Sequence, residues 1–312
     1  MKELYVAVDI GATRVRVSYG NEKGLTEKAV EFTNKIQGPE GIATQIIRMI
    51  KELNVRSIAA IGIGSAGPLN IKTGQLVKAH NFPFERIPIV DPISKAFDKP
   101  VTLLNDCSAA VLGEKIFGAG QGLNNIVYIT LSTGIGGGAI VDNHLLIGKD
   151  GNAVEIGHLT IDSNSSLICG CGCRGHWEAY CSGNRIPDYV RSLIKEKEMC
   201  KDISPELSDN EKLTTKTLFK IASKGDPLGL WIISKIGEIN AVAFANVVNV
   251  YDPELITIGG SIAINNPDLI LKPINENIEK HLINRKPEII HTPLREDVVL
   301  YGALALAMEK VK

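Results

Sequence analysis

The segment 155–178 concentrates residue types that bind metal ions. It holds three of the six cysteines and two of the six histidines, namely Cys169, Cys171, Cys173, His158 and His176. Thiolate and imidazole ligands at these spacings can close a tetrahedral zinc site, and the metal–ligand bonds would fold a loop too rich in glycine to fold by itself. Because Glu155 and Glu178 bracket the loop, we expect a metal that shapes a binding pocket and leaves the reaction to other residues.

The choice of zinc ligands is open, because the candidates exceed the four that a tetrahedral site takes. They are His158, Cys169, Cys171, Cys173, His176 and Cys181. Core cysteines or a disulfide are the alternatives to zinc. The cysteines at 169–173 are too close in sequence to bridge one another comfortably, and the surrounding glycines leave little core to join, so zinc is favoured.

Three glycine-containing turns follow strand-like runs. The first, Asp9 to Arg14, could alone be an ordinary hairpin turn. The second, 132–138, is rich in glycine. Ordering so many glycines costs conformational entropy on folding, which favours a turn whose backbone must approach a ligand closely. The third is Gly259-Gly260-Ser261. Backbone N–H groups and threonine hydroxyls suit phosphate oxygens, and the three turns together predict a nucleotide site. The arrangement is not that of a P-loop.

Asn105 and Asp106 end one strand and precede a helix expected to begin near Ser108. Asp106 could cap that helix. It could also be a catalytic base, because α/β folds place ligands at the carboxyl ends of strands. The two roles can coexist.

The elements that carry these residues alternate between strand and helix and predict a mixed α/β chain. A buried strand at 4–10, a turn and a second strand at 14–19 recur in pattern at 125–131 and 139–141, which hints at a duplicated fold. Further strands are expected at 57–64, 101–104 and 255–258, and helices at 40–53, 227–250, 268–281 and from about 299. The segment 195–217 is expected to form short helices and loop.

Bulk properties are those of a globular protein. The chain has 312 residues, 44% hydrophobic and 22% charged, with a net charge of −1, so no field favours nucleic acid or an anionic membrane. No apolar run approaches the roughly 20 residues that span a bilayer. The N-terminus enters a strand directly without a signal peptide, and we expect a cytoplasmic protein in which clustered cysteines bind metal.

With these residues identified, the chain resembles the ROK family of sugar kinases, repressors and related open reading frames, from about residue 4 to residue 308. The family's zinc signature is Glu-x-Gly-His followed by Cys-x-Cys-Gly-x-x-Gly-Cys-x-Glu, and here it reads Glu155-Ile156-Gly157-His158 and Cys169-Gly170-Cys171-Gly172-Cys173-Arg174-Gly175-His176-Trp177-Glu178. His176 stands where the family has its last cysteine. The resemblance implies a structural Zn²⁺ held by His158, Cys169, Cys171 and His176, with Cys173 as a substitute if His176 does not reach.

The resemblance also implies an actin/hexokinase-like (ribonuclease H-like, duplicated) ATPase fold of two lobes with a cleft between them. The small lobe would comprise 1–106 plus 296–312, and the large lobe 107–295 with the zinc loop. Asp9 would approach Mg²⁺, and ATP would be bound by Gly11, Thr13, Thr133, Gly134, Gly259 and Gly260.

The activity implied is an ATP-dependent hexose kinase in which Asp106 accepts the proton of the sugar's 6-hydroxyl. The sugar would be held by Gly67, Asn81, Asn105, Asp106, Glu155, His158 and Glu178. Glucose or a broad range of hexoses is the expected acceptor, with N-acetylmannosamine or N-acetylglucosamine as alternatives. A sugar-responsive regulator is the alternative of another class, but no room precedes residue 9 for a DNA-binding domain. We expect a homodimer or a dimer of dimers.

Overall fold

The computed structural model describes residues 3–78, 82–196, 207 and 212–309. The chain forms two compact units. Unit 1 comprises Met1–Tyr128, Gly138–Val154 and Thr292–Lys312, and unit 2 comprises Ile129–Gly137 and Glu155–His291. The lobes at 1–106 plus 296–312 and at 107–295 stay a prediction.

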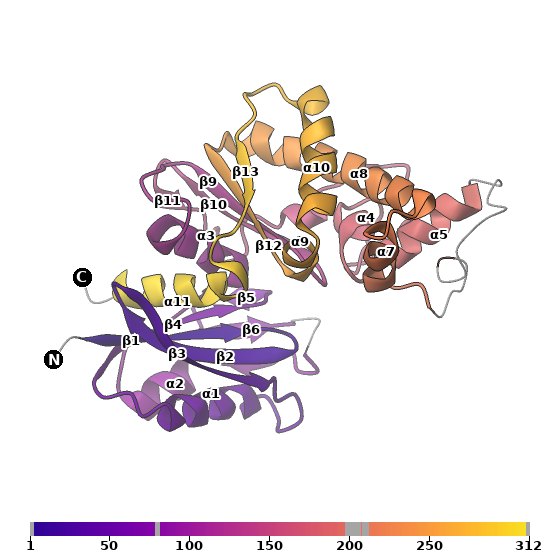
Figure 1. Ribbon diagram of the computed structural model, residues 1–312. Coiled ribbons are helices and arrows are strands. Elements are labelled where there is room, and N and C mark those ends of the chain that lie inside the picture. Colours follow the sequence, from indigo (N-terminus) through magenta and orange to yellow (C-terminus); the bar gives the residue numbers. More distant parts are fainter. Residues whose placement is uncertain (1–2, 79–81, 197–206, 208–211, 310–312) are drawn as a thin grey trace. The chain divides into compact units, whose positions relative to one another are not determined.

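Unit 1 contains a five-stranded sheet of order β3-β2-β1-β4-β8 (Figure 1). Its strands are β1 (Leu4–Ile10), β2 (Arg14–Asn21), β3 (Gly24–Phe32), β4 (Ile58–Ser65) and β8 (Val101–Asn105). The first three form an antiparallel meander. β4 then pairs parallel to both β1 and β8, so three strands end at the same edge of the sheet.

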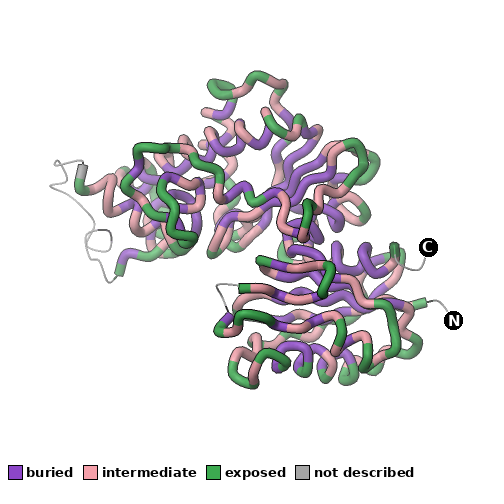
Figure 2. The backbone as a smooth tube through the Cα atoms, turned by 180° about the vertical axis from the view of Figure 1, so that it is seen from behind, coloured by how far each residue is buried: buried purple, intermediate pink, exposed green. Residues whose placement is uncertain are grey.

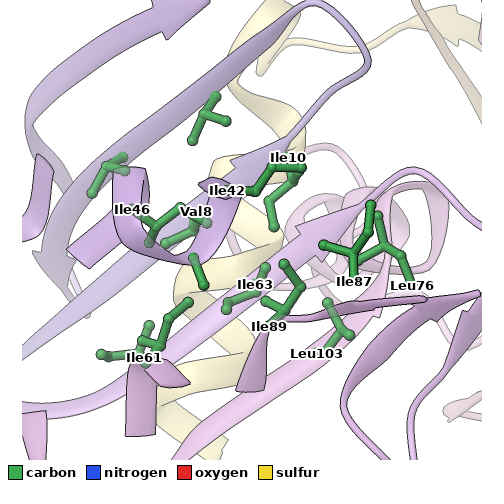
Figure 3. Packing of buried hydrophobic residues seen from close by; sticks show 14 of the residues in the cluster. Val8, Ile10, Ile42, Ile46, Ile61, Ile63, Leu76, Ile87, Ile89 and Leu103 are labelled. Carbon is green, nitrogen blue, oxygen red and sulfur yellow. The ribbon is translucent and has the colours of Figure 1, made fainter. Parts of the chain in front are cut away.

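The side chains of β1 alternate between two apolar layers, as the period of two in a strand requires. Val6, Val8 and Ile10 belong to a core shared with helices α1 (Gly41–Glu52) and α2 (Val90–Phe97) (Figure 3). Ala7 instead packs with side chains of the last helix, α11 (Val298–Glu309). The central strands are mostly buried, and the turns that connect them are mostly exposed (Figure 2).

The small residues of α11 allow it to lie close against its neighbours. A Cβ on Gly302 would stand 1.7 Å from the carbonyl oxygen of Ala109 in α3 (Asp106–Phe117), and one on Gly62 of β4 would stand 1.9 Å from that of Ala303. These glycines set the distance from α11 to α3 and to the sheet. Unit 1 also contains the sheet β5-β6-β7 (Leu69–Asn70, Gln75–Val77, Arg86–Pro88) and the 3₁₀ helix η3 (Arg295–Asp297).

A second five-stranded sheet has the order β11-β10-β9-β12-β13. Its strands are β9 (Ile126–Leu131), β10 (Ile135–Val141), β11 (His144–Leu145), β12 (Leu255–Gly259) and β13 (Glu288–His291). Three consecutive strands followed by two later ones repeat the plan of the first sheet, which confirms the duplicated fold. The expected glycine turn at 132–138 is wrong in its extent, because β10 already begins at Ile135.

Unit 2 carries most of the remaining helices. They are η1 (Ile156–His158), α4 (Glu178–Cys181), α5 (Ile186–Glu196), α7 (Thr215–Ala222), α8 (Pro227–Tyr251), α9 (Ser261–Asn265), α10 (Pro267–Asn277) and η2 (Ile278–His281). α8 is the single helix of the described chain whose length and composition would allow it to cross a membrane. Of its most apolar window, 56% is buried inside the protein, which explains its composition by a role in the core. The segment 195–217, which is expected to form short helices and loop, lies partly outside the described residues.

Candidate active site and metal centre

Several predicted site residues of unit 1 lie where its parallel strands end. Ile10 of β1 is the register partner of Ser65 in β4, and Ser65 is the partner of Asn105 in β8. Asp9 and Asp106 therefore lie at the same carboxyl edge of the sheet, with Gly67 just beyond β4. This edge is where α/β folds place their ligands.

Asn105 caps the helix that begins at Asp106. Its backbone is extended, and its Oδ1 accepts from the N–H groups of Cys107 at 2.9 Å and Ser108 at 3.4 Å. The helix begins two residues before the expected Ser108, and the cap is Asn105, so the assignment of this role to Asp106 is wrong. Asp106 instead accepts at Oδ1 from the N–H of Cys107 at 2.8 Å.

Burial makes both carboxyl groups at this edge easier to protonate. Desolvation raises the pKa of Asp106, although hydrogen bonds from Cys107 act in the opposite direction. Desolvation also raises the pKa of Asp9, to about 7, against the lowering effect of Arg16, whose Nη1 lies 3.2 Å from Asp9 Oδ2. The negative charges of Asp106 and Asp297 raise it further. A carboxyl cluster of this kind favours a bound cation, and its oxygen ligands suit Mg²⁺.

The turn after β1 is closed by two hydrogen bonds at Gly11. Gly11 N–H donates to the carbonyl of Arg14 at 2.9 Å, and Thr33 Oγ1 donates to the carbonyl of Gly11 at 2.8 Å. Thr13 is exposed. The predicted phosphate contacts thus lie on a turn that is fixed from both β2 and the end of β3.

The predicted sugar residue Gly67 lies beside Asn105 and Asn152. A Cβ at Gly67 would stand 3.5 Å from Asn105 Nδ2 and 3.5 Å from Asn152 Oδ1. Asn152 holds the next strand, because Leu69 N–H donates to its Oδ1 at 2.8 Å and its Nδ2 donates to the Leu69 carbonyl at 2.8 Å. Asn81, the other sugar residue predicted in this part of the chain, lies outside the described residues.

In unit 2, four predicted metal ligands converge. The ligand atoms of His158, Cys169, Cys171 and His176 all lie within 4.8 Å of one another. Nδ1 of His158 is 3.6 Å from Cys169 Sγ, and Nδ1 of His176 is 3.3 Å from Cys171 Sγ. Two thiols and two imidazoles form a donor set that fits zinc. Cys173 is exposed and is not among the four.

The zinc loop is shaped by a turn and by its anchor in the core. Cys169 N–H donates to the carbonyl of Cys173 at 2.8 Å, which closes the knuckle that carries Cys171. Gly175 has a φ of +66°, and a Cβ there would stand 1.7 Å from the carbonyl oxygen of Asp162. Trp177 is fully buried and donates from Nε1 to Asn240 of α8 at 2.8 Å.

The surroundings of the quartet shift the pKa values of two of its residues. Desolvation raises the pKa of Cys169 to about 12, and the nearby Glu178 carboxylate adds to this. Burial lowers the pKa of His176, and the charge of His158 lowers it further. The imidazole is thus neutral, as zinc requires, while the thiol needs the metal to hold its deprotonated form.

The predicted sugar residues of unit 2 lie at the margin of the metal quartet. Nε2 of His158, on the opposite side of the ring from Cys169, is 3.9 Å from Glu155 Oε2. Glu178 Oε1 lies 3.4 Å from Cys169 Sγ, while its Oε2 accepts from Ile135 N–H at 2.9 Å. Unit 2 therefore brings Glu155, His158 and Glu178 together with the metal ligands.

Unit 2 also brings its two nucleotide turns together. Gly260 has a φ of +88°, and a Cβ there would stand 2.4 Å from the carbonyl oxygen of Leu131. Ser132 Oγ and Ser261 Oγ are 3.2 Å apart. The turn with Thr133 and Gly134 and the turn with Gly259 and Gly260 are therefore direct neighbours.

Sequence reasoning missed Arg16, Asn152 and Asp297. Each acts on a predicted residue through the fold, across a strand pair or from a distant loop. The signal available in the sequence was weak: Arg16 alternates with apolar neighbours in a strand, and Asn152 follows the turn residues Asp150 and Gly151.

The chain is similar to known sugar kinases over nearly its whole length. The chain is 36% identical to a glucokinase from Pyrobaculum calidifontis over 97% of its length and 94% of that protein. Its fold matches a ROK hexokinase from Thermus thermophilus with a TM-score of 0.83, at 29% identity and 99% coverage of both chains. It also matches a ROK family glucokinase from Streptomyces griseus, solved with glucose and AMPPNP, with a TM-score of 0.78, at 28% identity and 98% and 99% coverage. The ROK family model matches residues 5–310, which confirms the resemblance and the α/β ATPase fold: the chain belongs to the ROK family.

Proposed function

We propose that the chain is an ATP-dependent kinase that transfers the γ-phosphoryl group to the 6-hydroxyl of glucose. The observation that carries this proposal is the place of Asp106, a carboxyl group of raised pKa at the carboxyl end of β8, in a chain 36% identical to a glucokinase over nearly its whole length. The reaction makes the chain a phosphotransferase with an alcohol acceptor.

Asp106 acts as the general base. Its raised pKa makes it a better proton acceptor than an exposed aspartate, and the Asn105 cap fixes the backbone that carries it. As the 6-hydroxyl oxygen of glucose attacks phosphorus, its proton passes to a carboxylate oxygen of Asp106. The bond from the γ-phosphorus to the bridging oxygen of ADP breaks at the same time.

The nucleotide is bound by the three turns. Gly11, Thr13, Thr133 and Gly134 contact the phosphates, and Gly259 and Gly260 contact the adenosine. Mg²⁺ would be held near Asp9, where it would neutralise phosphate charge. The support in the structure is the buried carboxyl group of Asp9, whose pKa is raised to about 7 by burial and by the charges of Asp106 and Asp297.

Zinc is proposed as the structural metal. Its ligands are His158, Cys169, Cys171 and His176, and bound zinc would cross-link the loop and leave phosphoryl transfer to other residues. The sugar is bound by Gly67, Asn81, Asn105, Asp106, Glu155, His158 and Glu178. Nε2 of His158 is proposed to face a sugar hydroxyl, because Nδ1 is directed at the metal quartet.

A cytoplasmic location is proposed as well, since ATP is supplied there and reduced thiols persist there. The oligomer is proposed to be a homodimer or a dimer of dimers, which sedimentation analysis would measure.

The decisive experiment is a coupled assay of ADP release across glucose, mannose, fructose, N-acetylglucosamine and N-acetylmannosamine. We expect the highest kcat/KM with glucose and a product that glucose-6-phosphate dehydrogenase oxidises. A higher kcat/KM with N-acetylmannosamine would make that sugar the preferred substrate in place of glucose. No release of ADP with any sugar would refute the proposed kinase activity. Metal analysis of the purified protein should give about one zinc per chain.

A further inference from the structure

The zinc loop of unit 2 contacts the nucleotide turn through Glu178. Oε2 of Glu178 accepts from Ile135 N–H at 2.9 Å, and a Cβ on Gly134 would stand 2.8 Å from the same oxygen. The other oxygen, Oε1, lies 3.4 Å from the metal ligand Cys169. One carboxylate therefore lies between a metal ligand and the backbone that follows Thr133 and Gly134.

The other end of the zinc signature contacts the same backbone. A Cβ on Gly157, in the segment that carries His158, would stand 2.2 Å from the carbonyl oxygen of Ile135. Ile135 thus donates its N–H to Glu178, while its carbonyl oxygen lies directly against Gly157. Both ends of the zinc signature contact the first residue of β10.

The segment after α4 completes the enclosure of the turn. Gly183 N–H donates to the carbonyl of Ser132 at 2.7 Å, and Asn184 N–H donates to that of Thr133 at 3.2 Å. These residues follow Glu178 directly through α4. The turn is consequently held by the zinc loop and its continuation at Ser132, Thr133 and Ile135.

We propose that Glu178 is a positioning residue for the nucleotide turn, so that metal bound by the quartet raises the affinity for the phosphates of ATP even when no sugar is present. The proposal deepens the kinase function and rests on it. Bound metal fixes the loop from His158 to His176. Glu178 follows His176 by two residues, so a fixed loop also fixes the carboxylate oxygen that accepts from Ile135 N–H. The ordered turn then binds phosphate without first losing conformational freedom.

The test is titration of AMPPNP with Mg²⁺ into the full chain without sugar, followed by calorimetry. Relative to the zinc-loaded wild type, we expect Kd to rise about tenfold in Glu178→Ala with zinc content preserved. A similar rise is expected in zinc-stripped protein and in Cys171→Ser. Cys173→Ser is the matched control, because Cys173 lies outside the quartet, and its zinc content and Kd should equal those of the wild type.

Two further readouts separate the hydrogen bond from a general loss of structure. Amide exchange at Ile135 should accelerate in Glu178→Ala, whereas Glu178→Gln retains an acceptor oxygen and should keep most of the protection and affinity. Unchanged AMPPNP binding and Ile135 exchange in Glu178→Ala would overturn this inference alone, as would a Gln variant as weak as the Ala variant. Absence of AMPPNP binding by the zinc-loaded wild type would overturn the kinase function itself.

Discussion

Arg16 of β2 and Asp9 of β1 are register partners, and Arg16 Nη1 donates to Asp9 Oδ2 at 3.2 Å. The same nitrogen donates to the carbonyl of Glu296 at 2.7 Å. Arg16 thus ties a predicted nucleotide-site carboxyl to the segment before α11. Burial outweighs this positive neighbour, since the pKa of Asp9 is raised to about 7.

This pKa predicts how the stability of the nucleotide-free protein depends on pH. Between about pH 4 and pH 7 the unfolded chain releases the proton of Asp9 while the native state keeps it. The native state then binds more protons, so the free energy of unfolding falls as pH rises through this window. Each unit of pKa difference corresponds to about 1.4 kcal/mol.

Asp9→Asn removes this titration and keeps an acceptor for Arg16. As pH rises from 4 to 8, the Tm of Asp9→Asn should increase relative to that of the wild type. The increase should be about 2–4 °C for each kcal/mol of unfolding free energy that the wild type loses. Thermal scans of both proteins across this range measure the difference, which a pH-independent Tm gap would contradict.

Asp106→Asn should abolish most turnover without harming the fold. The amide cannot take the proton of the sugar hydroxyl, so kcat should fall by about 10²–10⁴. Tm should stay the same or rise, because the variant no longer partly desolvates an ionisable group. Steady-state kinetics with glucose and ATP measure the loss. Asp91→Asn, an exposed first-turn acid of α2, is the matched control and should keep the wild-type kcat; a kcat near that of the wild type in Asp106→Asn would refute the base.

Two glycines of the zinc loop should respond differently to alanine. Both have positive φ, +66° at Gly175 and +90° at Gly172, which costs about 1 kcal/mol for a side chain. Only at Gly175 would the Cβ also meet backbone, 1.7 Å from Asp162 O, whereas nothing lies within 4 Å at Gly172. Gly175→Ala should therefore lose bound zinc and several degrees of Tm, while Gly172→Ala keeps its zinc. Equal zinc content in both variants, measured by metal analysis, would contradict this account of the loop.

Local spacing in the sequence predicts the strands. Spacing alone leaves six candidate metal ligands, and the resemblance to the ROK zinc signature selects the four of the metal quartet. Apolar runs bounded by turn residues set the strands, and the zinc signature sets ligands that the fold then brings within 4.8 Å of one another. The glycine run at 136–138 misleads, because it serves packing within a strand. A Cβ on Gly138 would stand 2.1 Å from the carbonyl oxygen of Cys107, a contact between segments that no local pattern reveals.

Residues that support the site from a distance are harder to predict for the same reason. The cap could be assigned to Asn105 or Asp106 from the sequence, and only the helix start decides in favour of Asn105. Arg16 and Asn152 act through strand register and loop contact. Their side chains are ordinary for a strand and a turn, so their partners become visible only once the sheet is formed.

Asn152 holds the backbone just beyond the predicted sugar residue Gly67. Asn152→Ala removes both 2.8 Å hydrogen bonds to Leu69, which should loosen this segment and raise the KM for glucose about 5- to 10-fold with kcat changed less than about twofold. Asn152→Asp keeps the acceptor and should be intermediate.

The matched control is Asn70→Ala. The side chain of Asn70, at the far end of β5, accepts from the N–H groups of Lys72 and Thr73. The variant removes a similar pair of backbone hydrogen bonds without releasing Leu69, so its KM for glucose should equal that of the wild type. Kinetics coupled to glucose-6-phosphate dehydrogenase measure both variants. If Gly67 loosens, sugar binding should weaken more than phosphoryl transfer slows. An equal KM in Asn152→Ala and Asn70→Ala would therefore show that other contacts hold the segment beyond Gly67.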